Sequence, residues 1–314
     1  MKCEKVKPAD AKRSLRAARQ VFRVADYDLT ATLSSGQVFR WRSEGQGWSG
    51  VVGGRWVHLE QNPEDIEAIT AVPVKDWKWL EEYLQLGTDL AAVLKTFPDD
   101  KPMRAATTGC QGLRLLRQDP WECLASFILS STKQIVQIRQ IIAVLCERYG
   151  ERIPVLPGFG AAFSFPSPIR LSLATEAELR ECKMGFRAAY LLATARHVAR
   201  PGNIDLEGLR GKTAEEARSA LMELPGVGRK VADCVLLFAY GFQPAFPLDV
   251  WVLKGLRDLY FRKRRVSAKR LERFAAKHFG PHAGYAQQYL FHYMRTRGRR
   301  NTDYCPPNTK TDYR

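Results

Sequence analysis

The sequence lacks the patterns that mark a metal cluster, a secreted protein or a membrane protein. It has 7 cysteines, but no two of them form a CxxC pair or a zinc-site spacing. A cysteine-ligated iron–sulfur cluster is excluded because the C-terminal region offers only Cys305. No apolar run approaches the roughly 18 residues of a membrane span, and no signal-peptide core is present. We therefore expect an intracellular protein with reduced thiols and no membrane partner, in the nucleus of a eukaryote or in the cytoplasm or nucleoid of a prokaryote.

Acidic residues are scarce relative to basic ones. Lys and Arg number 49 and Asp and Glu number 33, so the formal net charge is +16. Such an excess predicts a polyanionic partner, most simply DNA or RNA. Charge alone leaves open a basic protein with no such partner. The two densest basic runs lie near the C-terminus, at 262–265 and 295–300.

The pattern of hydrophobic residues changes along the chain and predicts an α+β fold. An N-terminal antiparallel β-sheet domain is followed by a mostly α-helical region. The expected divisions are a basic arm at 1–22, the sheet domain at 23–103, the helical region at 104–294 and a polar basic tail at 295–314. The arm is expected to be solvated or to face DNA, because Glu4 and Asp10 are atypical of a transit peptide. The polar tail is expected to be disordered.

Short segments rich in aromatic and β-branched residues predict the strands. They lie at 27–33, 38–41, 48–52 and 55–59, with a fifth near 66–72. Helical spacing of apolar residues begins at Trp77 and continues through the rest of the chain. Asp119 and Thr213 are expected to cap helices. The main expected helices are 120–130, 133–149, 176–183, 187–199, 214–224, 230–240, 250–259, 267–279 and 285–294.

The most informative stretch is LPGVGRKVADC at 224–234. It predicts a tight turn, since Pro fixes one backbone angle and Gly tolerates positive φ. The free backbone amides of Gly226, Val227 and Gly228, ahead of a helix, would bind the phosphates of a DNA backbone. Lys230 lies in the first turn of that helix. The pattern therefore predicts a site for a nucleic-acid backbone with an amine beside it.

Lys230 and Asp249 are the candidates for catalysis. A lysine alone is most often a solvated surface charge. Lys230, however, follows the glycine turn directly and shares a helix face with Cys234, and desolvation there would lower the pKa of its amine and allow Schiff-base chemistry. Asp249 stands between Pro247 and a new apolar helix, so we expect it to be the N-cap of that helix. The helix N-terminus would keep the carboxylate ionised, which suits the stabilisation of positive charge on a sugar.

Three blocks of sequence, in this order, resemble the 8-oxoguanine DNA glycosylases of the helix-hairpin-helix superfamily, in its bifunctional glycosylase/AP-lyase branch. SGQVFRW at 35–41 is similar to the signature of that family's first domain. LRLLRQDP at 113–120, with ECL two residues later, is similar to the start of its central helix. The stretch at 224–234 and PLDV at 247–250 are similar to its catalytic block. The resemblance covers nearly the whole chain and implies a helix-hairpin-helix at about 214–240.

The resemblance implies roles for the two candidate catalytic residues. Lys230 would attack C1′ of the damaged nucleoside, displace the base and form an imine that undergoes β-elimination. Asp249 would stabilise the developing oxocarbenium charge and assist proton transfer. Neither step requires a catalytic metal or an organic cofactor. The resemblance also leaves room for a structural metal ion at the carbonyls of the hairpin.

The resemblance further implies a pocket for the extruded base. The backbone carbonyl of Gly36 would accept the N7–H that 8-oxoguanine has and guanine lacks. Cys234 and Phe291 would sandwich the ring, and Gln287 would bind its Watson–Crick edge. A thiolate of Cys234 paired with the ammonium of Lys230 would present a dipole to the altered ring. Without the resemblance, Phe291 would be a helix core residue and Gln287 an exposed polar one.

Opening the duplex requires a residue that fills the vacated space and a wedge. Thr132 stands where the family commonly has the first Asn of an Asn-rich run, and Lys133 follows it. In the segment that matches a Gly-Tyr-Arg motif, Phe186 would be the wedge and Arg187 would read the opposing cytosine. Gln137 replaces a second family arginine, so we expect weaker discrimination among opposing bases.

The expected partner is double-stranded DNA that contains 8-oxoguanine, bound by a monomer. One departure from the family is Trp251, at a position where one branch has a phosphate-contacting histidine. An alkylpurine glycosylase of the same superfamily is a rival, but such enzymes generally lack the lysine at position 230. A non-catalytic helix-hairpin-helix DNA-binding protein is a second rival, which would leave Lys230 and Asp249 unexplained.

Overall fold

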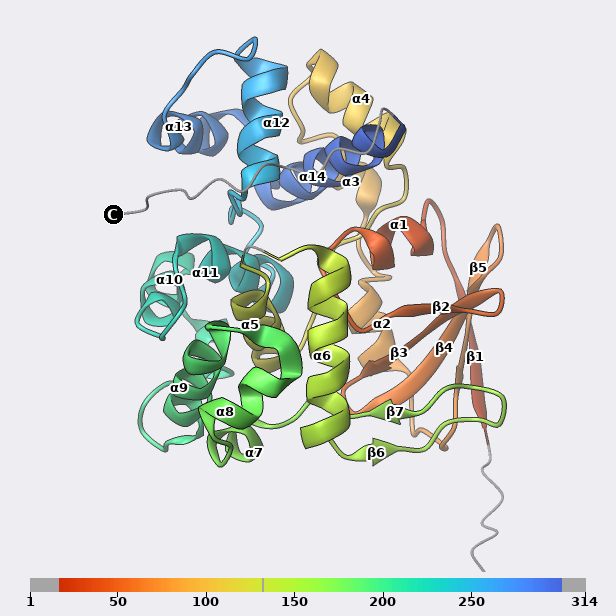
Figure 1. Ribbon diagram of the computed structural model, residues 1–314. Helices are drawn as coiled ribbons and strands as arrows, with labels where there is room; N and C mark the ends of the chain where they lie inside the picture. The colour runs from red at the N-terminus through yellow and green to blue at the C-terminus, as the bar shows by residue number, and fades with distance from the viewer. Residues whose placement is uncertain (1–16, 132, 301–314) are drawn as a thin grey trace, which may run out of the picture.

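The computed structural model describes residues 17–131 and 133–300, with side chains up to residue 296 (Figure 1). Its first part contains a five-stranded antiparallel sheet in the order β1-β5-β4-β3-β2, and a mostly helical part follows, which confirms the α+β class. The strands of this sheet are β1 (Ala18–Arg23), β2 (Arg42–Glu44), β3 (Gly47–Val52), β4 (Arg55–Gln61) and β5 (Asp65–Thr70).

Four helices lie among or after these strands in the chain before residue 110: α1 (Leu29–Ser34), α2 (Lys78–Leu84), α3 (Leu90–Leu94) and α4 (Lys101–Gly109). The helical part contains α5 (Pro120–Leu129), α6 (Ile135–Tyr149), α7 (Pro168–Ser172), α8 (Glu176–Leu179), α9 (Arg187–Ala199), α10 (Ala214–Met222), α11 (Arg229–Val235), α12 (Val250–Tyr260), α13 (Ala268–His278) and α14 (Ala283–Arg300). A small two-stranded sheet pairs β6 (Arg152–Ile153) with β7 (Ala162–Phe163). Among the described helices, none is both long and apolar enough to cross a membrane.

Side-chain caps set the starts of the helices as the sequence predicts. The carboxylate of Asp119 accepts a hydrogen bond from the Glu122 amide at 2.8 Å and begins α5. The hydroxyl of Thr213 caps α10 within a reciprocal capping box formed with Glu216. The helices expected at 176–183 and 230–240 are also present, but each of them changes to a π-helical turn in its second half.

Two of the expected strands are wrong. The segment at 27–33 contains α1 instead, because the Asp28 carboxylate accepts a hydrogen bond from the Ala31 amide and nucleates a helix. The segment at 38–41 is buried but pairs with no strand in the described residues. The strands expected at 48–52, at 55–59 and near 66–72 are confirmed as β3, β4 and β5.

The ends of the assigned divisions also differ from the structure. Residues 18–22 of the expected basic arm belong to the edge strand β1, and residues 1–16 lie outside the described residues. Residues 295–300 of the expected tail continue α14, and residues 301–314 lie outside the description. The helices α3 and α4, placed with the sheet by sequence, contribute Leu90 and Met103 to the core of the helical part. The helix α4 packs against α14, which in turn packs against α12, at the top of Figure 1.

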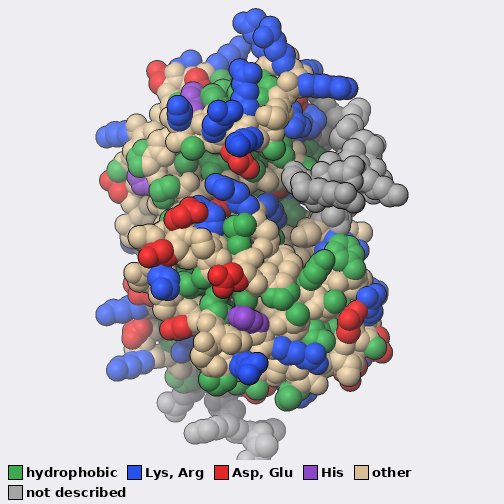
Figure 2. Space-filling view, turned by 90° about the vertical axis from the view of Figure 1, so that its left-hand side faces the viewer, with side chains coloured by type: hydrophobic (Ala, Val, Ile, Leu, Met, Phe, Trp, Pro, Cys, Tyr) green, Lys and Arg blue, Asp and Glu red, His purple; other side chains and the backbone are tan. Residues whose placement is uncertain are grey.

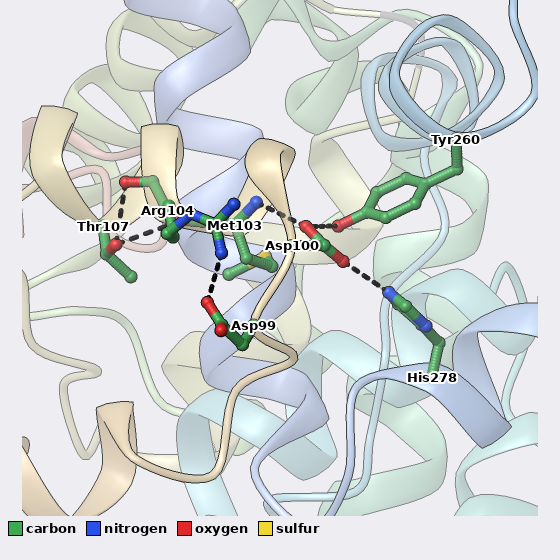
Figure 3. A network of polar contacts seen from close by, with 7 residues as sticks. All are labelled: Asp99, Asp100, Met103, Arg104, Thr107, Tyr260 and His278. Atoms are coloured by element: carbon green, nitrogen blue, oxygen red, sulfur yellow. Dashed lines mark hydrogen bonds and ion pairs between the residues drawn. The ribbon is translucent and has the colours of Figure 1, made fainter.

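A polar cluster fastens α4 to the C-terminal helices (Figure 3). The Asp100 carboxylate caps α4 by accepting from the Met103 amide. The same carboxylate accepts from the Tyr260 hydroxyl at 3.2 Å and lies 2.7 Å from Nε2 of His278. Tyr260 ends α12 and His278 ends α13, so one acid joins three helices. These contacts hold the helix that begins at Asp249 against the rest of the protein.

A buried ion pair joins the first domain to the central helix. The guanidinium of Arg40 lies 2.9 Å from the Glu122 carboxylate of α5, and it also donates to the carbonyl of Phe163. Burial raises the pKa of Glu122 and the Arg40 guanidinium opposes that rise. The Arg40 guanidinium therefore offsets part of the cost of burying this carboxylate.

We expect Arg40→Met to lower the free energy of unfolding by about 3 kcal/mol at neutral pH, because the mutation strands the buried Glu122 carboxylate. Urea unfolding measures this loss. The loss should shrink as the pH falls, since protonation then neutralises Glu122. Arg180→Met, which breaks an exposed pair with Glu176, is the control and should change stability little. Equal effects of the two mutations would contradict the interpretation.

Candidate active site

The hairpin at 225–228 joins α10 to α11 and exposes its backbone at the tip. Gly226 has a φ of +78°, and a Cβ there would lie 2.7 Å from Cβ of Tyr190, so only glycine fits. A Cβ at Gly228 would meet no atom within 4 Å, which leaves that side of the backbone open for another molecule. Val227 is only 6% exposed and its side chain packs in the core. The Val227 amide also donates to the Leu224 carbonyl at 3.1 Å, so the expectation that this amide is free to bind a phosphate is wrong for this structure.

Lys230 extends from the first turn of α11 toward the end of α5. Its ammonium Nζ donates to Oγ of Ser130 at 3.0 Å and lies 5.2 Å from the centre of the Phe127 ring. Ser130 is the C-cap of α5, and no sequence pattern indicates its contact with the lysine 100 residues later. A hydroxyl on one side and an aromatic face on another hold the amine in place.

Asp249 is the N-cap of α12, as expected, and accepts from the Val252 amide at 2.8 Å. Burial raises the pKa of this carboxyl above its ordinary value of 3.8. The Lys230 ammonium, the helix amides and the Arg295 guanidinium lower it, but by less than burial raises it. The helix N-terminus was expected to favour the ionised carboxylate, and its amides do lower the pKa, but desolvation is the larger effect and raises it.

Cys234 lies near both charged groups and is buried. Burial raises the pKa of the Cys234 thiol to about 12, although the nearby Lys230 ammonium acts in the opposite direction. The thiol is therefore protonated at neutral pH in this structure. The expected thiolate–ammonium dipole is wrong for this state, since one lysine does not offset the loss of water around the sulfur.

Two of the residues expected to form the base pocket, Gly36 and Phe291, lie side by side. Gly36 has a φ of +88°, and a Cβ there would lie 3.2 Å from Cε1 of Phe291 and 2.7 Å from Cδ1 of Ile135. Any side chain at position 36 would therefore fill space beside the Phe291 ring. Gln287, one turn earlier on α14, is only 4% exposed, and its Oε1 has no hydrogen-bond partner among the described residues. A buried acceptor without a partner is costly unless a ligand satisfies it.

The backbone at Gly36 is fixed by its neighbour Gln37. The buried Gln37 amide donates to the carbonyls of Thr32 and Arg114, and its oxygen accepts from the Leu116 amide at 2.8 Å. In return, the side chain of Gln118 donates to the Gln37 carbonyl at 2.7 Å. The first two blocks of resemblance thus lie against each other in space. Gln37 and Gln118, one from each block, hold the backbone beside Gly36 through these hydrogen bonds.

The structure also brings the expected strand-opening segments together. Phe186 is 54% exposed at the start of α9, and Cζ of Arg187 lies 4.4 Å from the centre of its ring. The Arg187 guanidinium donates to the carbonyls of Met184 and Ser131, so it is buried beneath the exposed ring. Lys133, two residues after Ser131, is half-buried, whereas Thr132 lies outside the described residues. An exposed aromatic ring next to this loop suits insertion into a base stack.

Two residues that depart from the family pattern have local roles. Gln137 is exposed and its Oε1 accepts from the Gln134 amide at 3.1 Å, which completes the capping box of α6. Trp251 is half-buried in the first turn of α12, where its backbone amide points to the Asp249 carboxylate. The structure thus shows Gln137 capping a helix in the free protein.

Basic side chains gather on one part of the surface. Figure 2 shows the face that lies on the left in Figure 1. Lys and Arg side chains are most frequent over its upper part, where Figure 1 places α12 and α13, while acidic and basic side chains mix lower down. Residues 262–265 form an exposed basic run in the loop between these two helices. Such a surface attracts a polyanion without reading its sequence.

Comparisons with known proteins match both parts of the chain. A family profile described as "8-oxoguanine DNA glycosylase, N-terminal domain" matches residues 20–124, and one described as "HhH-GPD superfamily base excision DNA repair protein" matches residues 125–281. An N-glycosylase/DNA lyase of Arabidopsis thaliana is 35% identical over 280 residues, which cover 84% of this chain and 76% of that protein.

Solved structures of other DNA glycosylases are also similar to this chain. An 8-oxoguanine glycosylase/lyase of Clostridium acetobutylicum, in complex with double-stranded DNA containing cytosine opposite 8-oxoG, is 31% identical with a TM-score of 0.82, over 89% of this chain and 98% of that one. A 3-methyladenine DNA-glycosylase of Archaeoglobus fulgidus is similar in fold alone, with 22% identity and a TM-score of 0.73 over 88% of this chain and 98% of that one. The chain belongs to the 8-oxoguanine DNA glycosylases of the HhH-GPD superfamily of base excision DNA repair proteins.

Proposed function

We propose that this protein excises 8-oxoguanine from duplex DNA through a Schiff base on Lys230 and then cleaves the strand as an AP lyase. The observation that carries the proposal is the arrangement around the amine. Lys230 is held by Ser130 beside the hairpin, and its charge acts on the buried Asp249 carboxylate. A nucleophile and an acid that stabilises positive charge are the two groups that the reaction requires.

The proposed reaction begins with a neutral Lys230 amine. Its lone pair forms a bond to C1′ of the flipped nucleotide while the N-glycosidic bond breaks and its electron pair leaves with the base. The amine loses a proton as the new C–N bond forms, and the base gains a proton as it departs. The sugar ring then opens to an imine, and loss of a proton from C2′ expels the 3′ phosphate by β-elimination. The Asp249 carboxylate stabilises the positive charge that develops on the sugar.

Recognition of the lesion follows from the backbone at Gly36. Its carbonyl would accept the N7–H of 8-oxoguanine, whereas the N7 of guanine would face it with a lone pair. Such a mismatch of buried acceptors costs on the order of 1–3 kcal/mol. The unpartnered Oε1 of Gln287 supports a base whose edge offers donors at that point.

Binding of the duplex would rest on backbone contacts. The amides of the hairpin and the exposed basic run at 262–265 would contact phosphates, so affinity should fall as salt rises. We propose that a monomer binds one lesion site, because one chain supplies the hairpin, the pocket and the wedge. The chemistry needs no metal or organic cofactor, since the Lys230 amine is itself the nucleophile.

A structural cation at the hairpin carbonyls stays a prediction. The carbonyl of Leu224 accepts from the Val227 amide, and that of Pro225 accepts from the Thr194 hydroxyl at 2.8 Å. Each carbonyl oxygen keeps a second lone pair, so both oxygens could still coordinate a cation. No step of the reaction depends on it.

A single-turnover assay with one 8-oxoguanine opposite cytosine, beside an undamaged duplex, tests the proposal. We expect free 8-oxoguanine and a cut strand from the damaged duplex only. Release of methylated purines without 8-oxoguanine would favour the alkylpurine rival. Binding to both duplexes without any released base would favour a non-catalytic DNA-binding protein.

We expect weaker discrimination among opposing bases than two arginine contacts would give, because Gln137 stands in place of one arginine. Each good contact to a base edge contributes about 1–3 kcal/mol of discrimination. Gln137→Arg should therefore increase the ratio of excision opposite cytosine to excision opposite adenine by roughly tenfold. Single-turnover rates on the two duplexes measure this ratio. An unchanged ratio would show that position 137 does not read the opposing base.

A further inference from the structure

Two side chains of α14 donate hydrogen bonds to one backbone carbonyl beside the base pocket. The Ser35 carbonyl accepts from Nε2 of Gln288 at 3.2 Å and from Nη1 of Arg295 at 3.2 Å. Gln288 and Arg295 are two turns apart and therefore lie on the same face of the helix. Ser35 directly precedes Gly36, so these two donors fix the backbone whose next carbonyl would read the lesion.

The Arg295 guanidinium lies inside this part of the pocket and not on the solvated surface. Its Cζ lies 5.3 Å from the centre of the Phe291 ring, and Nη1 lies 3.1 Å from the place that a Cβ of Gly36 would occupy. Arg295 had been assigned to the polar tail by sequence. It instead links Phe291, one turn earlier on α14, with the loop that carries Gly36.

The same cation acts on the catalytic acid. The charged and titratable groups that act on the Asp249 carboxylate are Lys230 and Cys234 of α11 and Arg295 of α14. Lys230 and Arg295 both oppose the rise in the Asp249 pKa that burial causes, and the protonated Cys234 adds no charge.

We propose that Arg295 is a positioning residue of the base pocket. Through its hydrogen bond to the Ser35 carbonyl and its place over the Phe291 ring, it fixes the Gly36 backbone for reading the lesion. The proposal deepens the proposed function and rests on it. Arg295 itself touches no reacting atom in this account.

Three substitutions separate the contribution of the hydrogen bond to Ser35 from that of the positive charge of Arg295. Arg295→Met removes the donor and the charge, Arg295→Lys keeps the charge without the planar fork, and Gln288→Met removes the other donor to Ser35 without changing charge. Arg210→Met is the matched control, because Arg210 also lies over a ring, that of Tyr240, and donates to a carbonyl, that of Ala239. Arg210 lies outside the pocket.

The first readout is the ratio of the dissociation constants for guanine and 8-oxoguanine duplexes, with a 2′-fluoro sugar that blocks excision. We expect Arg295→Met to lower this ratio about tenfold, the effect of one lost charged hydrogen bond. Gln288→Met should lower the ratio by less, and Arg295→Lys should recover part of it. Arg210→Met should leave it at the wild-type value.

The second readout is the acid side of the single-turnover excision profile. Arg295→Met should move the loss of activity to higher pH, because Asp249 loses a cation, whereas Arg295→Lys and Gln288→Met should not. If Arg295→Met melts far below wild type, Arg295→Gln gives the same comparison with a donor retained. In that variant the binding ratio should be partly kept while the acid limb still moves.

A folded Arg295→Met variant with the wild-type binding ratio would overturn the proposal. A wild-type enzyme that neither prefers nor excises 8-oxoguanine would instead overturn the proposed function itself. The two failures are distinct, because the second appears in the unmutated protein.

Discussion

Lys230→Gln is expected to abolish imine formation and to slow base release on the order of 10³-fold or more, while DNA binding is retained. The substitution removes the amine that Ser130 holds beside the hairpin and leaves a side chain of similar length. The hairpin amides and the basic run remain, so the dissociation constant for a lesion duplex should change little. Single-turnover base release and a binding titration on the same duplex measure the two effects separately.

Two controls sharpen this comparison. Lys230→Arg keeps the positive charge over Phe127 but lacks a nucleophilic amine, so it should be as slow as the glutamine variant. Lys254→Gln removes an exposed lysine that pairs with Asp258 on α12 and should behave as wild type. Base release by Lys230→Gln at a rate near that of Lys254→Gln would show that another group is the nucleophile.

Asp249→Asn is expected to slow base excision by about 10²–10⁴-fold without destabilising the fold. Asn caps a helix as well as Asp does, so α12 should keep its start. Because the pKa of Asp249 is raised in the folded state, its ionised form lowers stability at neutral pH. Removing that charge should leave the melting temperature equal to or above that of wild type. Melting curves and single-turnover rates together distinguish a catalytic acid from a helix cap.

The sign of the pH dependence follows from the same group. The carboxylate must be ionised to stabilise the sugar cation, and its pKa is above 3.8, so activity should fall with decreasing pH before an ordinary aspartate would protonate. Asp249→Asn should lack this acid limb. Near-normal excision by Asp249→Asn, or an unchanged acid limb, would reduce Asp249 to a structural cap.

Local signals in the sequence were sufficient for much of the helical part. Asp119 and Thr213 begin α5 and α10 as their side chains predict, and Asp249 begins α12. Errors arose where two local signals compete. In the segment at 27–33 the β-branched residues suggested a strand, but the cap at Asp28 decides for a helix. The edge strand β1 was not predicted, for two reasons. Its partner strand β5 lies more than forty residues away in sequence, and β1 itself follows a run of basic residues that is typical of a solvated arm.

The candidate site likewise contains residues that the sequence identifies and residues that only the fold brings together. Lys230, Gly226 and Gly228 stand in one contiguous motif, so the sequence alone identifies them. Ser130 and Arg295 act through contacts with residues 100 and 260 positions away, at Lys230 and Ser35, and only the folded chain brings these pairs together. Burial is the other quantity that sequence leaves open. It decides the protonation of Cys234 and the raised pKa of Asp249, against expectations from neighbouring charges alone.

The most direct test of the account is borohydride trapping of the wild-type protein on a duplex with one 8-oxoguanine opposite cytosine, followed by mapping of the modified peptide by mass spectrometry. We expect one covalent adduct, formed on the damaged duplex and absent from an undamaged one, with the sugar attached to Lys230. An adduct on a different lysine, or released base with no adduct and an intact strand, would contradict the claim that Lys230 is the nucleophile.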